Sequence, residues 1–395
     1  MKQVNEHRAE LASSASFNPF IAHDSSARVQ MMGSHLSQAL PVKDCQPRRI
    51  LTGMEREFGR ATFNVEIPVD AEIIDIIHKF TDTAGAGGIR INPTTVIIYM
   101  DARTNQFDAV EFNSYHSMHQ SFGFNFVRTQ AMRNLRPEQS IPAGTVLGRS
   151  PTLDDQDNYR IGLNVKSAFM SIPGVTEDGF IVSESLCKRM TTTCIKKTSF
   201  SWGKTWYPLN LYGDEKNYKP MPDIGDRIRD DGLICTLRRM DQDTDIMYYP
   251  LEMSNEALQR VDYFFDQRVY GKKGAKVINI TSRHGQRAWP RTPDGMEAQA
   301  KKYYDAECEF HQAILDSHRK LARRYGDRVA LGGTFSMLLR EARLFLPCEQ
   351  RAKSTQMYQL QPLDDWRIDL TYEYDFVPTI GSKLTGLHGD KGVIC

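Results

Sequence analysis

The sequence predicts an α+β protein that is rich in strands. Alternating apolar and polar residues dominate 60–130, and units of a turn followed by a strand recur at 141–147 and 224–234. Such units belong to compact β modules. Helical spacing of apolar residues is clearest in two stretches, 23–40 and 303–325.

The composition is that of an ordinary folded protein, with 40% hydrophobic and 25% charged residues in 395. At roughly 150 residues per domain, this length allows two or three domains. No apolar run approaches the roughly 20 residues of a membrane-spanning helix, and the N-terminus has no secretory signal. With a net charge of +1, nucleic-acid binding would need local basic patches or partner subunits.

Seven cysteines are scattered without a CxxC pair, so no zinc half-site is predicted. An odd, scattered set fits a reducing compartment with free thiols. We expect all of them to be small buried hydrophobic residues, with the possible exception of Cys395.

The first helix is predicted between His23 and Leu40. Asp24 or Ser25 can cap its start, Pro41 follows its end, and apolar residues recur every three or four positions, at Val29, Met32, Leu36 and Leu40. Arg28 lies beside this apolar stripe. Taken alone, it is a solvent-facing helix arginine.

Strands follow the first helix. Segments 94–99 and 107–112 flank a polar turn at 103–105 and predict a hairpin, whereas 71–80 fits either a helix or a strand. Farther along, helical spacing predicts a helix of roughly 28 residues that ends at Tyr325, with Gly326 as the stop. Its narrow apolar stripe favours a projecting helix or half of a coiled hairpin. A strand at 370–377 then returns the chain toward its end.

The final stretch, Ile380–Ile394, carries Lys383 and Lys391 in glycine-flanked turns, eight positions apart. Glycine lets the backbone approach a ligand closely, and an ammonium group is a compact charge for a phosphate. Lysine and glycine alone describe a solvated loop. With Gly386, His388 and Gly389 in place, however, the stretch resembles the active-site signature of the β subunit of multisubunit DNA-dependent RNA polymerases.

Two earlier stretches resemble the same family. The run from His23 to Glu55 is similar to the fork segment beside the active centre, where an arginine at the position of Arg28 contacts the triphosphate of the incoming nucleotide. The run 162–184 resembles the stretch that carries an acidic pair near the catalytic metals, and Glu177 and Asp178 match that pair. Without the resemblance, the pair is an exposed turn after a strand.

The sequence departs from the family pattern in several places. Ser37 stands where bacterial β subunits usually have a second arginine, Ser382 replaces the usual Asp, and Asp390 replaces the usual Asn. The connection that leads to Glu177 and Asp178 is one residue shorter than usual. These departures indicate a divergent lineage.

The resemblance implies a β-type polymerase fold with a double-psi β-barrel interrupted by a flap-like insertion. Its expected parts are an N-terminal arm and fork-type helix (1–60), a β-rich region (61–150), the first part of the barrel (151–190), the flap-like insertion with its long helix (191–375), and the barrel return with the lysine signature (376–395).

The resemblance also implies half of an active site for template-directed RNA synthesis. Lys383 and Lys391 would hold the RNA 3′ end and the reacting phosphates, Arg28 would bind the triphosphate, and Glu177 and Asp178 would act in the outer sphere of the second metal. The chain has no DxDGD cluster, so Mg²⁺ is expected on a partner β′-type subunit and the chain alone is expected to be inactive.

A complete β subunit would extend beyond both ends of this sequence, so we expect a split subunit like those of giant bacteriophages. Expected partners are the β N-terminal half, β′-type halves, a possible phage specificity subunit, DNA template, RNA and NTPs, without a membrane. The expected location is the cytoplasm of the infected bacterium, or the virion for a packaged polymerase.

Two other readings stay open. A non-catalytic nucleic-acid-binding barrel or assembly scaffold could keep the polymerase fold, but the survival of Arg28, Lys383 and Lys391 argues against it. A single-chain RNA polymerase of the RNA-silencing type would require a DxDGD cluster, which the sequence lacks.

Overall fold

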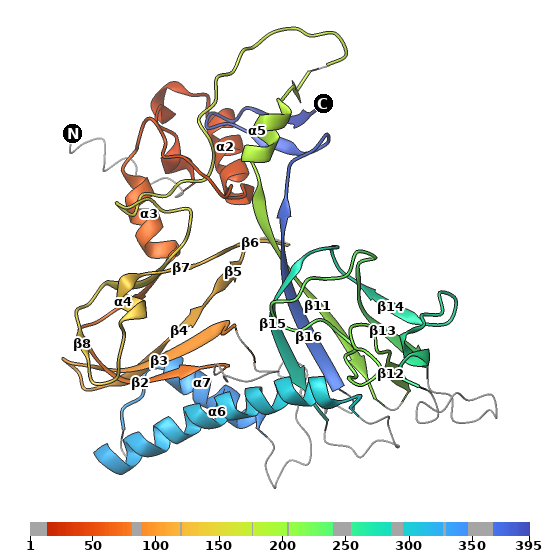
Figure 1. Cartoon of the computed structure of the whole chain (residues 1–395). Coiled ribbons are helices and arrows are strands. Elements are labelled where there is room, and N and C mark those ends of the chain that lie inside the picture. The colour runs from red at the N-terminus through yellow and green to blue at the C-terminus, as the bar shows by residue number, and fades with distance from the viewer. Residues whose placement is uncertain are drawn as a thin grey trace.

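The computed structural model describes residues 14–80, 89, 91–118, 121–175, 177–203, 205–239, 254–285, 295–326, 329–346 and 366–395. Within these ranges the chain is mixed α and β and rich in strands, in line with the predicted class. The strands form five small sheets, and two helices lie beneath two of them (Figure 1).

The first part of the body is a four-stranded sheet of order β4-β3-β2-β8. Its strands are antiparallel and comprise β2 (Ala71–His78), β3 (Thr94–Asp101), β4 (Phe107–Asn113) and β8 (Ser140–Ile141). The predicted hairpin is confirmed as β3–β4, and segment 71–80 proves to be a strand. A smaller sheet of order β1-β9-β7 lies nearby, built from β1 (Asn64–Ile67), β7 (Val127–Arg128) and β9 (Thr145–Arg149).

The longest strands belong to a five-stranded sheet of order β15-β16-β11-β6-β5. Strands β11 (Thr192–Trp202) and β16 (Trp366–Phe376) pair antiparallel along all 11 residues of each strand. The remaining strands are β5 (Tyr115–Ser117), β6 (Phe122–Asn125) and β15 (Lys276–Arg283). A separate sheet next to it consists of β12 (Trp206–Pro208), β13 (Leu233–Arg239) and β14 (Gln267–Tyr270).

Helix α6 (Ala298–Tyr325) has the predicted length and stop, but the expectation that it projects is wrong. Figure 1 shows it running beneath the sheets. Its Tyr303 packs in the core around β15 and β16, and Ile314 packs in the core of the β3–β4 sheet. The apolar stripe looks narrow because polar side chains are buried along it. Glu307 pairs with Lys79 at 2.5 Å, and both side chains are less than a tenth exposed.

Helix α7 (Gly333–Phe345) was not foreseen, and it packs against α6. Its Phe335 contacts His318 of α6, and its Phe345 contacts His311, so the two helices run antiparallel. The expected hairpin partner of the long helix is therefore real, but the pair lies against the sheets. The buried face of α7 repeats at helical spacing: Phe335, Leu338, Leu339 and Ala342.

Shorter elements complete the described chain: η1 (Ala15–Phe17), η2 (Ile21–His23), α2 (Ser26–Gln38), α3 (Met54–Thr62), α4 (Gln130–Arg133), α5 (Glu184–Arg189), η4 (Ala257–Gln259), β10 (Gly179–Phe180), β17 (Lys383–Thr385) and β18 (Lys391–Ile394). None of the helices in the described ranges is long and apolar enough to cross a membrane. Cys45, Cys194 and Cys235 are buried as predicted, Cys187 and Cys308 are partly exposed, Cys395 is exposed, and Cys348 lies outside the described residues.

Candidate functional site

Two distant segments, 179–180 and 383–394, meet in a small sheet of order β10-β18-β17, at the top of Figure 1. Strand β18 pairs in parallel with β10, where Gly179 lies opposite Val393, and antiparallel with β17, where Lys383 lies opposite the same Val393. The backbone amide of Val393 also donates to the carbonyl of Asp178 at 3.0 Å. The segments that precede β10 and carry the final lysines are thus joined by backbone hydrogen bonds. The double-psi barrel as a whole stays a prediction.

Both lysines occupy the same face of this sheet. Side chains alternate between faces along a strand, and Lys383, Thr385, Lys391 and Val393 are all exposed, whereas Gly392 and Ile394 are buried. Thr385 lies opposite Lys391, so the two lysines are diagonal neighbours, with Cα atoms about 7–8 Å apart. The face therefore presents two adjacent positive charges to solvent.

Helix α2 brings Arg28 to this sheet. Ser25, one of the two caps that the sequence allowed, accepts a hydrogen bond from the Arg28 amide at 3.3 Å. The Arg28 Nη1 donates to the carbonyl oxygen of Gly389 at 3.0 Å, across 361 positions of sequence. Gly389 has a left-handed φ of 81°, and a Cβ there would lie 2.5 Å from the Arg28 carbonyl oxygen. Only glycine allows so close an approach in this conformation.

Two histidines add contacts that sequence reasoning missed. His35 Nδ1 lies 3.1 Å from the Thr385 hydroxyl, and His388 Nδ1 lies 3.9 Å from Asp24 Oδ2. The His388 ring also stacks on Phe20, with 6.2 Å between ring centroids. The signal available in the sequence was the spacing of Arg28 and His35, which are seven positions apart and so share one helix face.

The acidic pair lies beside the sheet with exposed side chains. Glu177 has a positive φ of 52°, which is uncommon for a residue with a side chain, and Asp178 leads directly into β10. Neither carboxylate forms an ion pair with Lys383 or Lys391 in the part of the chain that is described. The acidic pair thus lies at the same sheet as the two lysines, but its carboxylates and their ammonium groups are not in contact within the described residues.

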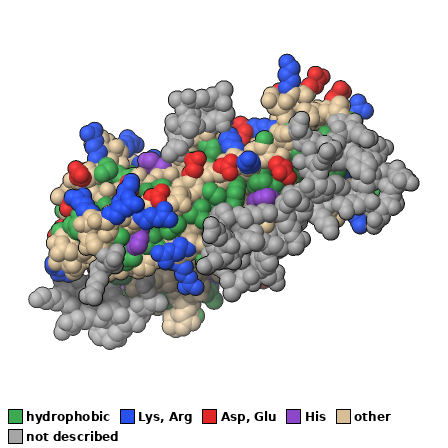
Figure 2. Space-filling model, turned by 90° about the horizontal axis from the view of Figure 1, so that it is seen from below, with side chains coloured by type: hydrophobic (Ala, Val, Ile, Leu, Met, Phe, Trp, Pro, Cys, Tyr) green, Lys and Arg blue, Asp and Glu red, His purple; other side chains and the backbone are tan. Residues whose placement is uncertain are grey.

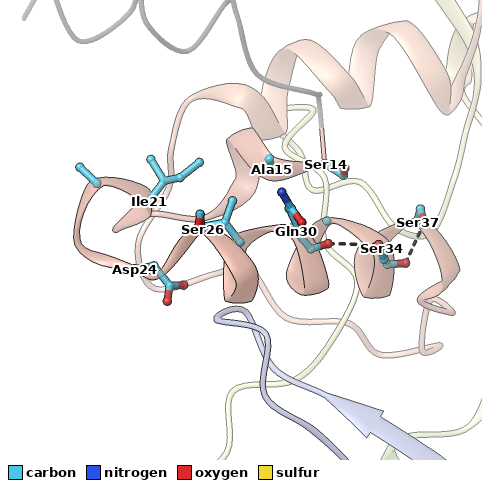
Figure 3. A pocket seen from close by; sticks show the side chains of 11 residues that line it. Ser14, Ala15, Ile21, Asp24, Ser26, Gln30, Ser34 and Ser37 are labelled. Atoms are coloured by element: carbon cyan, nitrogen blue, oxygen red, sulfur yellow. Dashed lines mark hydrogen bonds between the residues drawn. The ribbon is translucent and has the colours of Figure 1, made fainter.

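A cleft of about 850 Å³ lies along the opposite side of α2 (Figure 3). In this view Ser14 and Gln30 lie on the side of the helix away from the C-terminal ribbon. Ser37 also lines the cleft, and its hydroxyl donates to the Ser34 carbonyl at 2.7 Å. The position where the resemblance anticipates a second arginine therefore carries a small side chain bonded to its own helix.

The described ranges also bear on metal binding. They contain no group of three or more His, Cys, Asp or Glu side chains placed to hold a metal ion. The candidate site offers two adjacent carboxylates, Glu177 and Asp178, and Mg²⁺ prefers oxygen ligands of this kind, with water and substrate phosphates completing its octahedral shell.

Comparison with curated proteins relates the chain to one kind of subunit. It is 24% identical over 331 residues to the DNA-directed RNA polymerase subunit beta of Dehalococcoides mccartyi, covering 80% of this chain and 24% of that protein. The same subunit of Thermosipho melanesiensis is 24% identical over 362 residues, covering 85% and 28%. That of Nitratidesulfovibrio vulgaris is 26% identical over 223 residues, covering 54% and 14%.

The chain is a distant homologue of RNA polymerase β subunits. No family model matches it. This β-subunit homologue spans about a quarter of the length of the D. mccartyi and T. melanesiensis subunits. Their shared region covers most of the chain, which agrees with a resemblance carried by separate stretches near the start, middle and end of the sequence.

Proposed function

We propose that this β-subunit homologue supplies phosphate-binding cations to the active site of a DNA-directed RNA polymerase, which it shares with a β′-type subunit. One observation carries the proposal: the contact between Arg28 and Gly389 places helix α2 against the turn between the strands that bear Lys383 and Lys391. Three cations from the two ends of the chain thereby gather around one turn.

The chemistry of nucleotide addition requires such a cluster. The RNA 3′-hydroxyl attacks the α-phosphate in line, and negative charge is spread over the phosphate oxygens in the transition state. Cations fixed in advance stabilise that charge without reorganising. Lys383 and Lys391 would hold the RNA 3′ end and the reacting phosphates on the exposed face of the sheet.

Arg28 would bind the triphosphate of the incoming nucleotide. A guanidinium group has five N–H donors in a planar fork, and here the bond from Nη1 to the Gly389 carbonyl occupies one of its nitrogens. That bond orients the group against the lysine turn. The remaining donors suit bidentate contacts with phosphate oxygens.

Mg²⁺ would come from the partner subunit. Bound metal neutralises phosphate charge and lowers the barrier to in-line attack. Glu177 and Asp178 fit a role in the outer sphere of the second metal, because their exposed carboxylates are next to each other and next to β10. Because the sequence lacks a DxDGD cluster, we expect the chain neither to supply the catalytic metal nor to act alone.

We also propose a divergent lineage, the split polymerases of giant bacteriophages, acting in the infected bacterium or in the virion. The low identity to bacterial subunits and the replacements Ser382 and Asp390 support it. The partners would be separate β and β′-type polypeptides, a possible specificity subunit, the DNA template, RNA and NTPs.

The test uses the enzyme assembled with its natural partners. Lys383→Ala and Lys391→Ala should each slow nucleotide addition at least tenfold while leaving assembly intact, since removing one preorganised charge contact typically costs a hundredfold or more. Lys188→Ala is the matched control, because Lys188 is an exposed lysine that pairs with Glu184. Near-normal elongation by both site variants would favour a scaffold instead.

Arg28→Ala should mainly raise the NTP concentration needed for half-maximal elongation, with a smaller effect on the maximal rate. A residue that contacts the triphosphate in both the bound substrate and the transition state changes binding more than turnover. An unchanged NTP requirement would contradict the proposed role of Arg28.

A further inference from the structure

The last turns of α6 carry a concentrated positive charge. Arg319, Lys320, Arg323 and Arg324 are all exposed, and their spacing of one and four positions aligns them along one side of the helix. We call these four residues the basic stripe. Figure 2 shows Lys and Arg side chains gathered on the left part of this face, the end of the molecule where α6 terminates in Figure 1.

Neutralisation within the chain is incomplete along the stripe. Arg319 pairs with Asp316 at 2.8 Å, and the Arg324 guanidinium lies 5.4 Å from the centre of the Tyr325 ring. Lys320 and Arg323 form no ion pair with any residue that the structure describes. The neighbouring helix adds a further exposed cation at Arg340.

Helix stability accounts for part of the stripe only. The macrodipole favours cations in the last turn, which explains Arg323 and Arg324. It does not reach Arg319 and Lys320, and like charges four positions apart destabilise a helix. Two such pairs occur here, Arg319 with Arg323 and Lys320 with Arg324. A bound polyanion would offset this repulsion by attracting all four cations.

We propose that the basic stripe binds the phosphate backbone of double-stranded DNA without reading its sequence. Guanidinium and ammonium groups in a regular row match a regular row of phosphates. A single strand would instead favour a series of exposed aromatic rings for base stacking. Among the described residues the stripe adjoins Tyr325, an exposed ring that lies between Arg324 and Phe107, and no row of such rings follows the four cations. The surface lies at the far end of the molecule from the lysine turn (Figure 1), so it does not rest on the proposed active site.

The test measures binding of the full chain to a fluorescent 30-base-pair duplex by anisotropy, at several salt concentrations and with two unrelated sequences. Four phosphate contacts predict a slope of log affinity against log salt of about −3.6, or roughly a hundredfold loss between 50 and 200 mM. The double variant Lys320→Gln/Arg323→Gln should reduce the steepness of this slope by about 2, equally for both sequences.

Controls separate the stripe from charge in general and from the active site. Lys196→Gln/Lys216→Gln removes two exposed lysines elsewhere and should bind DNA as the parent does. Duplex binding by the chain and nucleotide addition by the assembled enzyme are separate measurements, so failure of either proposal can be recognised separately. Circular dichroism verifies that each variant is folded.

Three outcomes would overturn the proposal. The first is an unchanged slope in the stripe variant. The second is tighter binding of single-stranded DNA, with the shallower slope of about −0.7 per phosphate. The third is competition by polyglutamate as effective as that by duplex of equal charge, which would assign the stripe to an acidic protein partner.

Discussion

The body of the chain and its candidate site are held together by different means. In the body, β11 and β16 pair over 11 residues, and side chains such as Tyr303, Leu370 and Phe335 are almost completely buried. In the site, strands of two to four residues carry exposed lysines, and polar contacts attach them to α2. Burial stabilises the body, whereas backbone geometry positions the site.

The difference implies separate responses to mutation. Large apolar side chains of the body should control global stability, since each removes much surface from water. Residues of the site should alter local order and phosphate chemistry with small effects on global unfolding. Each of the following experiments tests this separation.

The largest effect is expected from Phe335→Ala in α7. Phe335 is fully buried between α6, α7 and the β3–β4 sheet, so truncation leaves a cavity that costs about 3–5 kcal/mol. Urea unfolding followed by circular dichroism measures the loss. Met337→Ala on the exposed side of the same helix should stay within about 0.5 kcal/mol, and equal losses would contradict the assignment of this core.

A smaller effect should come from protonation of His311. Burial beside Phe345 lowers the pKa of His311 from 6.5 to about 4. The unfolded state therefore takes up the proton at a higher pH, and stability present above pH 6.5 is lost as the pH falls toward 4. The loss should reach about 2 kcal/mol by pH 5. His311→Gln removes this contribution, so its stability should depend less on pH; the same dependence in both proteins would refute it.

Gly389→Ala tests whether backbone geometry positions the lysine turn. The change combines strain at a positive φ with a clash against the Arg28 backbone, and we expect about 1–3 kcal/mol of local destabilisation. Amides of 383–394 should exchange hydrogen roughly five- to a hundredfold faster, with the body unaffected.

Gly381→Ala is the matched control for this substitution. Gly381 has a similar φ of 90° but nothing within 4 Å of an added Cβ. An alanine there is therefore strained in its backbone but clashes with no neighbour. If both variants loosened the turn equally, contact with α2 would not be what holds it.

The smallest effect is expected from His388→Gln. The ion pair of His388 with Asp24 is long, at 3.9 Å, and the histidine side chain is half-exposed, so its loss should change global stability by less than about 1 kcal/mol. Hydrogen exchange should reveal slightly faster opening of the turn only. A global loss comparable with that of Phe335→Ala would break the distinction between site and body.

Local sequence patterns predicted the elements that depend on local chemistry. The Ser25 cap, the β3–β4 hairpin and the end of α6 at Tyr325 all follow from spacing and turn residues. The environment of α6 did not follow, because its polar residues are buried by partners far away in sequence. Glu307 meets Lys79, and Ser317 donates to Asp75 at 2.6 Å. No window of sequence contains both members of such a pair.

The main cations of the candidate site could be predicted from the sequence, whereas the contacts around them could not. Lys383, Lys391 and Arg28 stood out through glycine spacing and family resemblance, and the structure places Arg28 at the turn between the lysine strands. The contacts of His35 with Thr385 and of His388 with Asp24 could not be inferred, since each joins segments more than 340 positions apart.

The long ladder of β11 and β16 has a mechanical consequence. Strand β15 is bonded to residues 367–373 of β16, above α6. The far end of the ladder extends beyond β15, and there β11 follows α5 and β16 leads toward β17 (Figure 1). An antiparallel pair of this length acts as a stiff lever arm. A tilt of the body would therefore move the acidic segment and both lysine strands together. Their mutual spacing would stay the same, while the direction in which these side chains face would change.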